Sequence, residues 1–539
     1  MDKLPLLTLI AFTPLLGALV LLFVPKQQGR LIKTIALIAT LIPLVLAAAL
    51  YAAYQASGDP VQFKEMYSWI KIPLNKEGLE QITSFFFEFK YNLAVDGLSL
   101  PLVFLTALVS AMAALASFHI KKRWKTFYIC FLLLETGMFG VFMAQDLFLF
   151  FLFFEITLVP MFFLVGIWGY LDREKAANKF LIYNGIGSAI MLIAFLIIVA
   201  TVGFTMTQTN NEVILSYSGD IHQIAHNLFQ DPNAFVNQAK PNNPFFMSDT
   251  MKWTVFLMLL VAFGIKLPIF PFHTWMLRVH TEAPPSIVMI HSGILLKMGA
   301  YGLIRFGVLF FPAQAKEAAL LLGILGVINI LYGAALAVVQ REFKLVLAYS
   351  SISHMGVVLL GLAAFNTSGL QGAVFQLVSH GLISALLFLL VGSIYERTET
   401  TELGALGGLA KSIPFMSGIL LIAGMASLGL PGLSGFIGEF LAFVGMFGTY
   451  KAVAAVGALG IILAAVYVLR GVLSITFGPI AAQYAGIRDA RLVEAIPMIT
   501  LVAFILLLGI YPSVLSEPLQ QTISGMDQLL HSAAGHIGG

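Results

Sequence analysis

The stretch VAFGIKLPIFPFHTW, residues 261–275, decides the fold, because it sets two prolines and a lysine inside a run that is otherwise apolar enough to cross a membrane. Proline removes a backbone donor and clashes with the preceding turn, so we expect the helix to open at Pro268 and Pro271. Open backbone at membrane depth is tolerated only where protein or water satisfies its carbonyl groups. The stretch therefore predicts a broken membrane helix whose gap lies beside Lys266.

A second stretch, ASLGLPGLSGFIGEF at residues 426–440, repeats this pattern in the other half of the chain. Pro431 and Gly432 interrupt the apolar run shortly before Glu439. Interrupted helices in the two halves of a chain, each beside an ionisable residue, are typical of inverted-repeat transport folds. We therefore predict an all-α polytopic membrane protein with two inverted repeats, each containing a broken helix. The alternative is that each break is only a packing kink.

The composition places the whole chain in lipid. Hydrophobic residues make up 59% of its 539 residues, charged residues make up 11%, and the mean hydropathy is +0.92. The net charge of +3 gives no sign of nucleic-acid binding, and the single cysteine, Cys130, cannot supply an iron–sulfur ligand set. We read the first apolar run as a retained helix, because it is longer than a signal-peptide core and lacks a convincing cleavage site.

The apolar runs predict about 14 membrane helices at roughly 20 residues per span. These runs fall at about 6–24, 32–54, 97–118, 126–144, 146–168, 180–204, 252–276, 286–310, 317–339, 344–363, 370–394, 412–449, 452–475 and 493–514. Polar stretches at about 55–95 and 205–250 interrupt them, and we infer no function for either. We expect four segments: 1–125 with helices 1–3, 126–310 as the first repeat, 311–475 as the second repeat, and 476–539 with helix 14 and the C-terminal tail.

Lysine and arginine gather in alternate short loops, which by the positive-inside rule face the cytoplasm. Both termini and the two polar stretches then lie on the opposite side. The basic residues are Lys26, Arg30, Lys33, Lys121, Lys122, Arg123, Lys125, Arg173, Lys175, Arg341, Lys344, Arg397, Lys411, Arg488 and Arg491.

Ionisable residues also lie inside the apolar runs, where a charge costs roughly 2.5–3.5 kcal/mol on the insertion scale. Burial disfavours the charged form of such a group and a nearby opposite charge restores it, so a contact that forms and breaks can load and release a proton. The alternative for each is a buried ion pair or a hydrogen-bonded packing group. The candidates are Glu155, Lys266, Lys297, Glu439, Glu135, His273, His291, His354 and His380.

Our mechanistic hypothesis is a relay between these groups. Glu155 pairs with Lys266, and loss of this pairing drives the Lys266 proton towards Lys297 and onward to Glu439, with water and histidines bridging the gaps. The hinges of this motion are expected at the helix breaks, at Pro268, Pro271, Pro431 and Gly432.

Five other polar residues favour simpler roles. Asp96 and Asp146 stand at helix starts, where a carboxylate caps backbone donors. Arg305 is expected to be a snorkelling residue or an interhelical partner rather than a proton carrier. His280 and Glu282 form an H-x-E spacing, but no cysteine pair accompanies it, so zinc chemistry is not expected.

Seven segments of the chain resemble the antiporter-like subunits of respiratory complex I, a family shared with Mrp-type sodium/proton antiporters and membrane-bound hydrogenases. By this resemblance Glu155, Lys266 and Lys297 match the family's helix-five glutamate, broken-helix lysine and central lysine. His354 and His380 match histidines of its central hydrophilic axis, Glu135 matches a helix-four glutamate, and Glu439 favours the M-type members over those with lysine. The segments are NLAVDGLSLPLV (92–103), AQDLFLFFLFFEITLVPMFFLVGIWG (144–169), FGIKLPIFPFHTWMLRVHTEAPPS (263–286), IHSGILLKMGAYGLIRFG (290–307), LAYSSISHMGVVLLG (347–361), QLVSHGLISALLFLLVGSIYERT (376–398) and ASLGLPGLSGFIGEFLAFVG (426–445).

The resemblance implies a proton-translocating membrane-arm subunit of an NADH:quinone oxidoreductase, coupling quinone reduction elsewhere in the complex to proton pumping. It implies no redox centre or metal in this chain, with NAD, FMN, iron–sulfur clusters and quinone held by partner subunits. The expected partners are other membrane-arm subunits, the lipid bilayer and protons, in a bacterial plasma membrane. Two alternatives stay open at this point: a subunit of an Mrp-type sodium/proton antiporter, and a passive structural membrane subunit.

Overall fold

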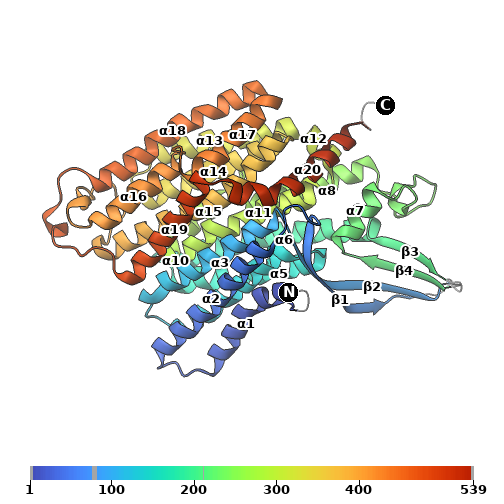
Figure 1. The fold of residues 1–539 in the computed structure, drawn as a ribbon, viewed down its shortest axis with the longest axis horizontal. Helices are drawn as coiled ribbons and strands as arrows, with labels where there is room; N and C mark the ends of the chain where they lie inside the picture. The colour runs from blue at the N-terminus through green and yellow to red at the C-terminus, as the bar shows by residue number, and fades with distance from the viewer. Residues whose placement is uncertain (1–3, 76–81, 210–211, 536–539) are drawn as a thin grey trace.

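The protein is a bundle of membrane-length helices with a small sheet at one end (Figure 1). The structure is a computed structural model, and it describes residues 4–75, 82–209 and 212–535. Within these residues, 12 helices are long and apolar enough to cross a membrane. The expected polytopic helical fold is therefore confirmed.

The 12 spans follow the predicted apolar runs closely. They are α1 (Leu6–Phe23), α2 (Gly29–Ala53), α3 (Ser99–Ala116) with a short turn to His119, α4 (Trp124–Met143), α5 (Leu147–Trp168), α6 (Arg173–Thr201), a composite span Pro285–Val308, α13 (Ala319–Val339), α14 (Phe343–Ala363), α15 (Thr367–Thr398), α18 (Lys451–Thr476) and α19 (Leu492–Ile510). The composite span comprises α10 (Pro285–Ile290), a π-helical segment His291–Leu295, α11 (Leu296–Gly302) and a second π-helical segment Leu303–Val308. Helices α6 and α15 extend beyond the predicted runs because their polar ends stay helical, and hydropathy detects only the apolar part.

Both predicted helix breaks are present. The first broken helix comprises α8 (Asp249–Lys266) and α9 (Thr274–Glu282), and the second comprises α16 (Pro414–Ser427) and α17 (Ser434–Thr449). Together with the 12 spans, these two broken helices account for the predicted number of crossings. The inserted prolines explain the gaps, because each lacks the amide that would continue the helix.

The first gap is stabilised by a side chain from another helix. Asn329 of α13 is fully buried, and its Oδ1 accepts a hydrogen bond of 2.8 Å from the Phe270 amide. Its Nδ2 donates to the Pro268 carbonyl over 3.3 Å. Trp275 of α9 donates from its indole to the Ile265 carbonyl over 3.0 Å. The freed backbone groups are thus satisfied by protein, as unwound backbone at membrane depth requires.

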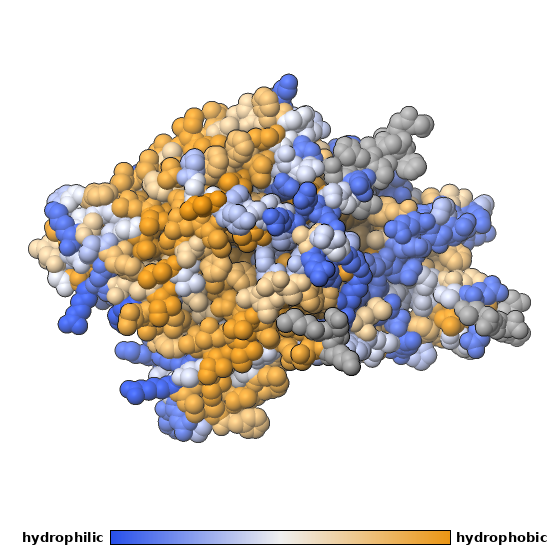
Figure 2. All heavy atoms as spheres, viewed as in Figure 1, coloured by the Kyte–Doolittle hydropathy of each residue, from blue (hydrophilic) through white to orange (hydrophobic). Residues whose placement is uncertain are grey.

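The helices divide into lipid-facing and central ones. The most apolar windows of the composite span and of α15 are 100% buried inside the bundle, whereas those of α2 and α18 are only 33% buried. Apolar residues cover the middle of the molecule in Figure 2, and hydrophilic residues gather towards its two ends. The central helices are therefore shielded from lipid by the outer ones, and they carry most of the candidate residues.

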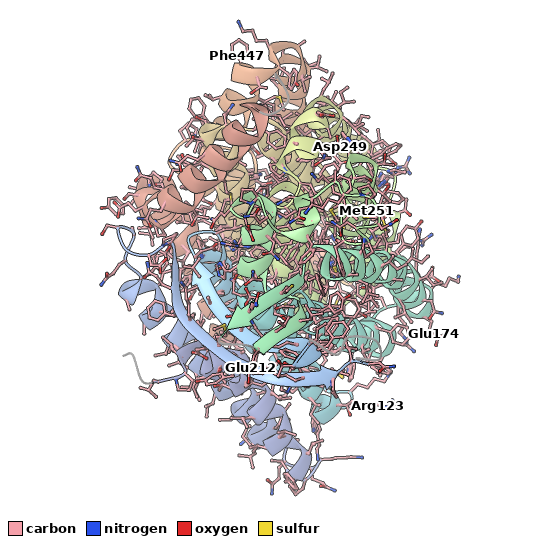
Figure 3. All side chains as sticks on the ribbon, turned by 90° about the vertical axis from the view of Figure 1, so that its right-hand side faces the viewer. Arg123, Glu174, Glu212, Asp249, Met251 and Phe447 are labelled. Atoms are coloured by element: carbon pink, nitrogen blue, oxygen red, sulfur yellow. The ribbon has the colours of Figure 1, made fainter. Side chains whose placement is uncertain are left out.

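A four-stranded sheet, which the sequence analysis did not predict, forms the polar end seen in Figure 3. Its strands are β1 (Val61–Pro73), β2 (Ser84–Asp96), β3 (Phe204–Thr209) and β4 (Glu212–Ser218), in the order β1-β2-β4-β3. Strands β2 and β4 pair in parallel, with Ser84 opposite Ile214, while the other two pairs are antiparallel. The two polar stretches, far apart in the sequence, thus form one sheet.

Three further helices lie outside the predicted runs. They are α7 (Ile221–Phe229), α12 (Pro312–Glu317) and α20 (Ser513–Gly535). Helix α20 contacts α12 and α15, and the Thr522 hydroxyl accepts a hydrogen bond of 3.0 Å from the Gly97 amide before α3. Helix α19 ends at Ile510, and α20 begins at Ser513. The last predicted run, which extended to about residue 514, therefore covers the end of one helix and the start of the next.

Candidate functional site

A line of hydrogen-bonding side chains runs through the centre of the bundle and begins at Lys297. This lysine is fully buried on α11, and its Nζ lies 2.7 Å from Nδ1 of His380 on α15. The same Nζ donates to the carbonyl oxygen of Ser292, which belongs to the preceding π-helical segment. A π-helical turn shifts the following residues around the helix, and such turns are frequent at functional sites.

His380 connects Lys297 to the serine-rich face of α14. Its Nε2 lies 3.2 Å from the Ser351 hydroxyl, and that hydroxyl lies 3.4 Å from the hydroxyl of Ser292. The rings of His380 and His354 are 5.3 Å apart between centroids. A cavity of about 10 Å³ lies against both rings and is lined also by Ser427. That is about the space one water molecule needs, so a water can bridge the two histidines.

The line ends at the second broken helix. Nδ1 of His354 lies 3.2 Å from Oε1 of Glu439 on α17, and Nε2 lies 3.3 Å from the hydroxyl of Ser427, the last residue of α16. Gln376 of α15 places its Nε2 3.1 Å from the same Nδ1. His354 therefore contacts both halves of the broken helix, and any movement at Pro431 and Gly432 would alter these contacts.

In the first repeat, Lys266 is the last residue of α8 and is 2% exposed. Its Nζ lies 5.0 Å from the ring centre of Phe154 and 5.6 Å from that of Phe180. No ion pair within 4.0 Å joins Lys266 to Glu155 in the described part of the chain, and Oε1 of Glu155 has no hydrogen-bond partner there. The expected ion pair is therefore not formed in this structure. The reason is local, because consecutive residues of α5 point in different directions and the ring of Phe154 faces the ammonium.

A pair of histidines lies between the two lysines. Nδ1 of His291 is 2.8 Å from Nε2 of His280, and both rings are fully buried. The ring of Phe180 lies 6.2 Å from that of His291 and 5.6 Å from the Lys266 ammonium. His273 points elsewhere: its Nε2 lies 3.3 Å from the hydroxyl of Tyr332 on α13. The structure thus pairs His291 with His280 and places His273 against Tyr332, and no hydrogen bond of the described residues joins these groups to the polar line.

Glu135 of α4 is fully buried, and neither of its carboxylate oxygens has a hydrogen-bond partner among the described residues. It is not joined to the central line by any hydrogen bond of the described residues. Pro268 and Pro271 lie in the gap between α8 and α9, and Pro431 and Gly432 lie in the gap between α16 and α17. Their positions agree with the predicted hinges, while hinge motion itself stays a prediction.

The acids expected to cap helices do so. Oδ1 of Asp96 accepts hydrogen bonds from the amides of Leu98 and Ser99, and its Oδ2 forms a 2.6 Å ion pair with Arg305. Oδ1 of Asp146 accepts hydrogen bonds from the first amides of α5. Burial raises the pKa of the Asp146 carboxyl to about 7, and the nearby Asp220 adds to this rise. Arg305 is accordingly the interhelical partner that the sequence analysis expected.

Several contributors were not among the candidate residues: Ser292, Ser351, Gln376 and Ser427 of the polar line, and His280 of the histidine pair. Two of them carried a usable signal, since Ser351 lies three residues before His354 and Gln376 four residues before His380, the spacings that share a helix face. His280 gave no such signal, because its partner His291 lies across the turn between α9 and α10, at a spacing that no single helix face shares.

Comparison with known proteins agrees with this arrangement. Residues 144–466 match the family described as NADH:quinone oxidoreductase/Mrp antiporter, TM. The chain is 36% identical over 541 residues to the NADH-quinone oxidoreductase subunit M of Rhodobacter capsulatus, covering 99% of this chain and 98% of the relative. It is 37% identical to an NAD(P)H-quinone oxidoreductase chain 4 of Thermosynechococcus vestitus, and the match covers 98% of this chain and 93% of the relative.

Solved structures give the same fold. Respiratory complex I from Thermus thermophilus with bound NADH contains a chain with a TM-score of 0.78 and 27% identity, covering 97% of this chain and 99% of that one. The Mrp complex of a Dietzia species also gives a TM-score of 0.78, over 98% of this chain and 99% of that one, but at 22% identity this likeness shows the fold alone. The chain therefore belongs to the NADH:quinone oxidoreductase/Mrp antiporter family of membrane subunits, as an M-type subunit of NADH:quinone oxidoreductase.

Proposed function

We propose that this subunit translocates protons along the line that joins Lys297, His380, His354 and Glu439. The observation that carries the proposal is the continuity of the line, with contacts of 2.7 Å from Lys297 to His380 and 3.2 Å from His354 to Glu439. His354 and Glu439 lie within ion-pair distance, and the two histidines, which share no hydrogen bond in the described residues, can be bridged by water in the cavity beside Ser351. A proton can therefore move by short hops through a bundle that is otherwise apolar.

The groups at the two ends of the line suit this role. Lys297 is buried without a carboxylate partner within 4.0 Å in the described residues, so its charge depends on the polar groups around it. Glu439 lies directly after the second helix break, where the backbone turns through Gly429 and Gly432 at positive φ. Those positions favour glycine because a side chain would be strained there. A carboxylate next to such a break can change partners with little disturbance of the helices.

The first repeat supplies the switch in this proposal. The ammonium of Lys266 now lies against two aromatic rings, and no ion pair within 4.0 Å joins it to Glu155 in the described residues. A movement at the adjoining gap, residues 267–273, would exchange this arrangement for a direct Glu155–Lys266 contact. The change in charge at Lys266 would then reach Lys297 through the His280–His291 pair. Two such arrangements are what coupling to a distant site requires.

The proposal also covers the partner subunits, the cofactors and the membrane. The chain works within a respiratory complex, with other membrane-arm subunits as its partners. We place NAD, FMN, iron–sulfur clusters and quinone in those partner subunits, and the single cysteine of this chain supports that placement for the clusters. We also propose a bacterial plasma membrane, with both termini on the non-cytoplasmic side, as the distribution of basic loops favours.

The test uses the assembled complex reconstituted in liposomes. Lys297→Met and Glu439→Gln should each lower the number of protons pumped per NADH oxidised by at least half. The matched controls are Lys175→Met and Glu174→Gln, which change exposed residues at the start of α6 and should leave this number unchanged. If the complex assembles normally with either central variant and pumps at the parent ratio, the proposal is wrong.

A further inference from the structure

A cavity of about 140 Å³ opens at the end of the bundle that carries the basic loops. It lies where α3 and α15 end and where α10 and α19 begin, away from the two helix breaks. Its walls include the side chains of His119, Ser286, Glu396, Arg491 and Glu494. Two of the four helices around it, α10 and α15, belong to the fully buried centre of the bundle.

The mouth of this cavity is ringed by titratable groups. Nδ1 of His119 lies 3.3 Å from Oε1 of Glu396, and both side chains are about one-third exposed, at 29% and 31%. Arg491 forms ion pairs of 3.1 Å with both Glu396 and Glu494. Glu494 is held in turn by Arg397 over 2.7 Å. The arginines fix the carboxylates in place, so the His119–Glu396 contact is held at the rim of the cavity.

The floor of the cavity contains a polar group that lacks a partner. The hydroxyl of Ser286, on the first turn of α10, is 1% exposed and forms no hydrogen bond within the described chain. A buried hydroxyl left without a partner costs about 1–3 kcal/mol, so native structures satisfy such groups with protein or ordered water. Because this hydroxyl lines a cavity, water is the partner that fits.

Two more buried polar atoms without a partner in the described chain belong to the His280–His291 pair. Nδ1 of His280 and Nε2 of His291 are buried and have no hydrogen-bond partner in the described residues. His291 follows Ser286 by five residues along one continuous helix, so it lies deeper in the bundle by a rise of roughly 7.5 Å. The ring of His280 also packs 5.0 Å from that of Phe388, the neighbour of the cavity residue Leu389.

We propose that this cavity is where the subunit takes up protons from the side of the basic loops. The His119–Glu396 pair binds the proton, water held at Ser286 carries it inward, and the His280–His291 pair delivers it to Lys297. Each step moves one proton between oxygen and nitrogen atoms and leaves every carrier ready for the next. This inference rests on the proposed function, because it supplies the proton that the central line then conducts.

The first experiment measures NADH-driven proton pumping by the assembled complex in liposomes. Ser286→Val removes the hydroxyl and keeps the volume, and it should lower the initial pumping rate at least fivefold. Ser286→Thr keeps the hydroxyl and should retain the parent rate, as should Ser188→Val, which makes the same change at a buried, unpartnered serine of α6. An unchanged rate with Ser286→Val overturns the uptake route. Glu439→Gln serves as the reference, because a normal rate there would instead refute the proposed function.

The second experiment tests water access without relying on pumping. In a Cys130→Ala background, a cysteine is placed at cavity residue Ser393 or at Ser188, and the membrane-impermeant reagent 2-(trimethylammonio)ethyl methanethiosulfonate is added to either side of native membrane vesicles. Mass spectrometry of this chain should show modification of Ser393→Cys from the side of the basic loops only. Modification no greater than that of Ser188→Cys, or modification from the opposite side only, would overturn the proposal.

Discussion

The ion pair between Asp96 and Arg305 gives the sharpest prediction about what holds the bundle together. The two side chains meet over 2.6 Å and are only 5% and 9% exposed. Asp96 ends β2 and caps α3, while Arg305 lies in the last π-helical segment of the composite span. Asp96→Asn keeps the shape of the side chain and an oxygen for the cap, but it leaves the guanidinium buried without its carboxylate.

The magnitude follows from burial. Removing one partner of a buried ion pair costs about 3–5 kcal/mol, because the remaining charge is neither solvated nor paired. The capping contribution, about 1 kcal/mol, is largely retained by the asparagine oxygen. At about 2 °C per kcal/mol, the low end for large domains, the melting temperature should fall by roughly 6–10 °C. Asp59→Asn is the matched control, because the Lys64–Asp59 pair has a similar length of 3.2 Å but is more than half exposed.

The assay is thermal unfolding of the purified complex in detergent, followed through this subunit, for Asp96→Asn, Arg305→Met and the double variant. Because the double variant has no unpaired charge, it should be more stable than either single variant, and the two substitutions should be strongly non-additive. If Asp96→Asn lowers the melting temperature no more than Asp59→Asn does, or if the two effects simply add, the ion pair does not stabilise the bundle as argued.

Three further predictions concern other parts of the chain. Burial raises the pKa of Asp146 to about 7, above its unfolded value of about 3.9. The stability of the folded subunit should therefore decrease as the pH rises from about 4 to about 7. Asp146→Asn should flatten this decrease in pH-dependent thermal melts. A methyl group on Gly140 would meet a phenylalanine ring of α5 at 2.0 Å, whereas one on Gly185 would meet nothing within 4 Å. Gly140→Ala should therefore destabilise the subunit by about 1–3 kcal/mol and reduce the amount of assembled complex on a native gel. Gly185→Ala should leave that amount unchanged. Lys344 is 7% exposed, and its ammonium lies 4.0 and 4.4 Å from the centres of two tyrosine rings. Lys344→Met should destabilise the subunit by about 2 kcal/mol in thermal melts. Lys179→Met, which removes a ring contact of 5.7 Å, should change the melting temperature little.

The membrane spans could be predicted from the sequence because lipid imposes a length and an apolar composition on each one. The two helix breaks were equally visible, since Pro268 and Pro431 cannot continue a helix in any surroundings. The candidate residues Lys297, His380 and Glu439 could be named for the same kind of reason, because an ionisable group in an apolar span needs an explanation in itself. None of these inferences required knowing which helix packs against which.

The sheet was not predicted, because the parallel pairing of β2 with β4 joins stretches more than a hundred residues apart. Such pairing leaves no pattern of alternating residues in either stretch from which the partner could be inferred. Its residues lay in stretches that hydropathy reads only as polar. The side chains that complete the first helix break were also invisible, since Asn329 belongs to a different helix from the backbone groups it satisfies.

For this protein, the sequence alone determined how many times the chain crosses the membrane, where two of those crossings open, and which charges lie within them. These features follow from local chemistry, because a transfer free energy or a missing amide acts on a residue wherever the chain places it. Only the tertiary structure decided which charges meet: Lys297 with His380, His354 with Glu439, His280 with His291, and Lys266 with aromatic rings in place of Glu155. Contacts between helices depend on packing directions, which the spacing of residues along one helix cannot specify.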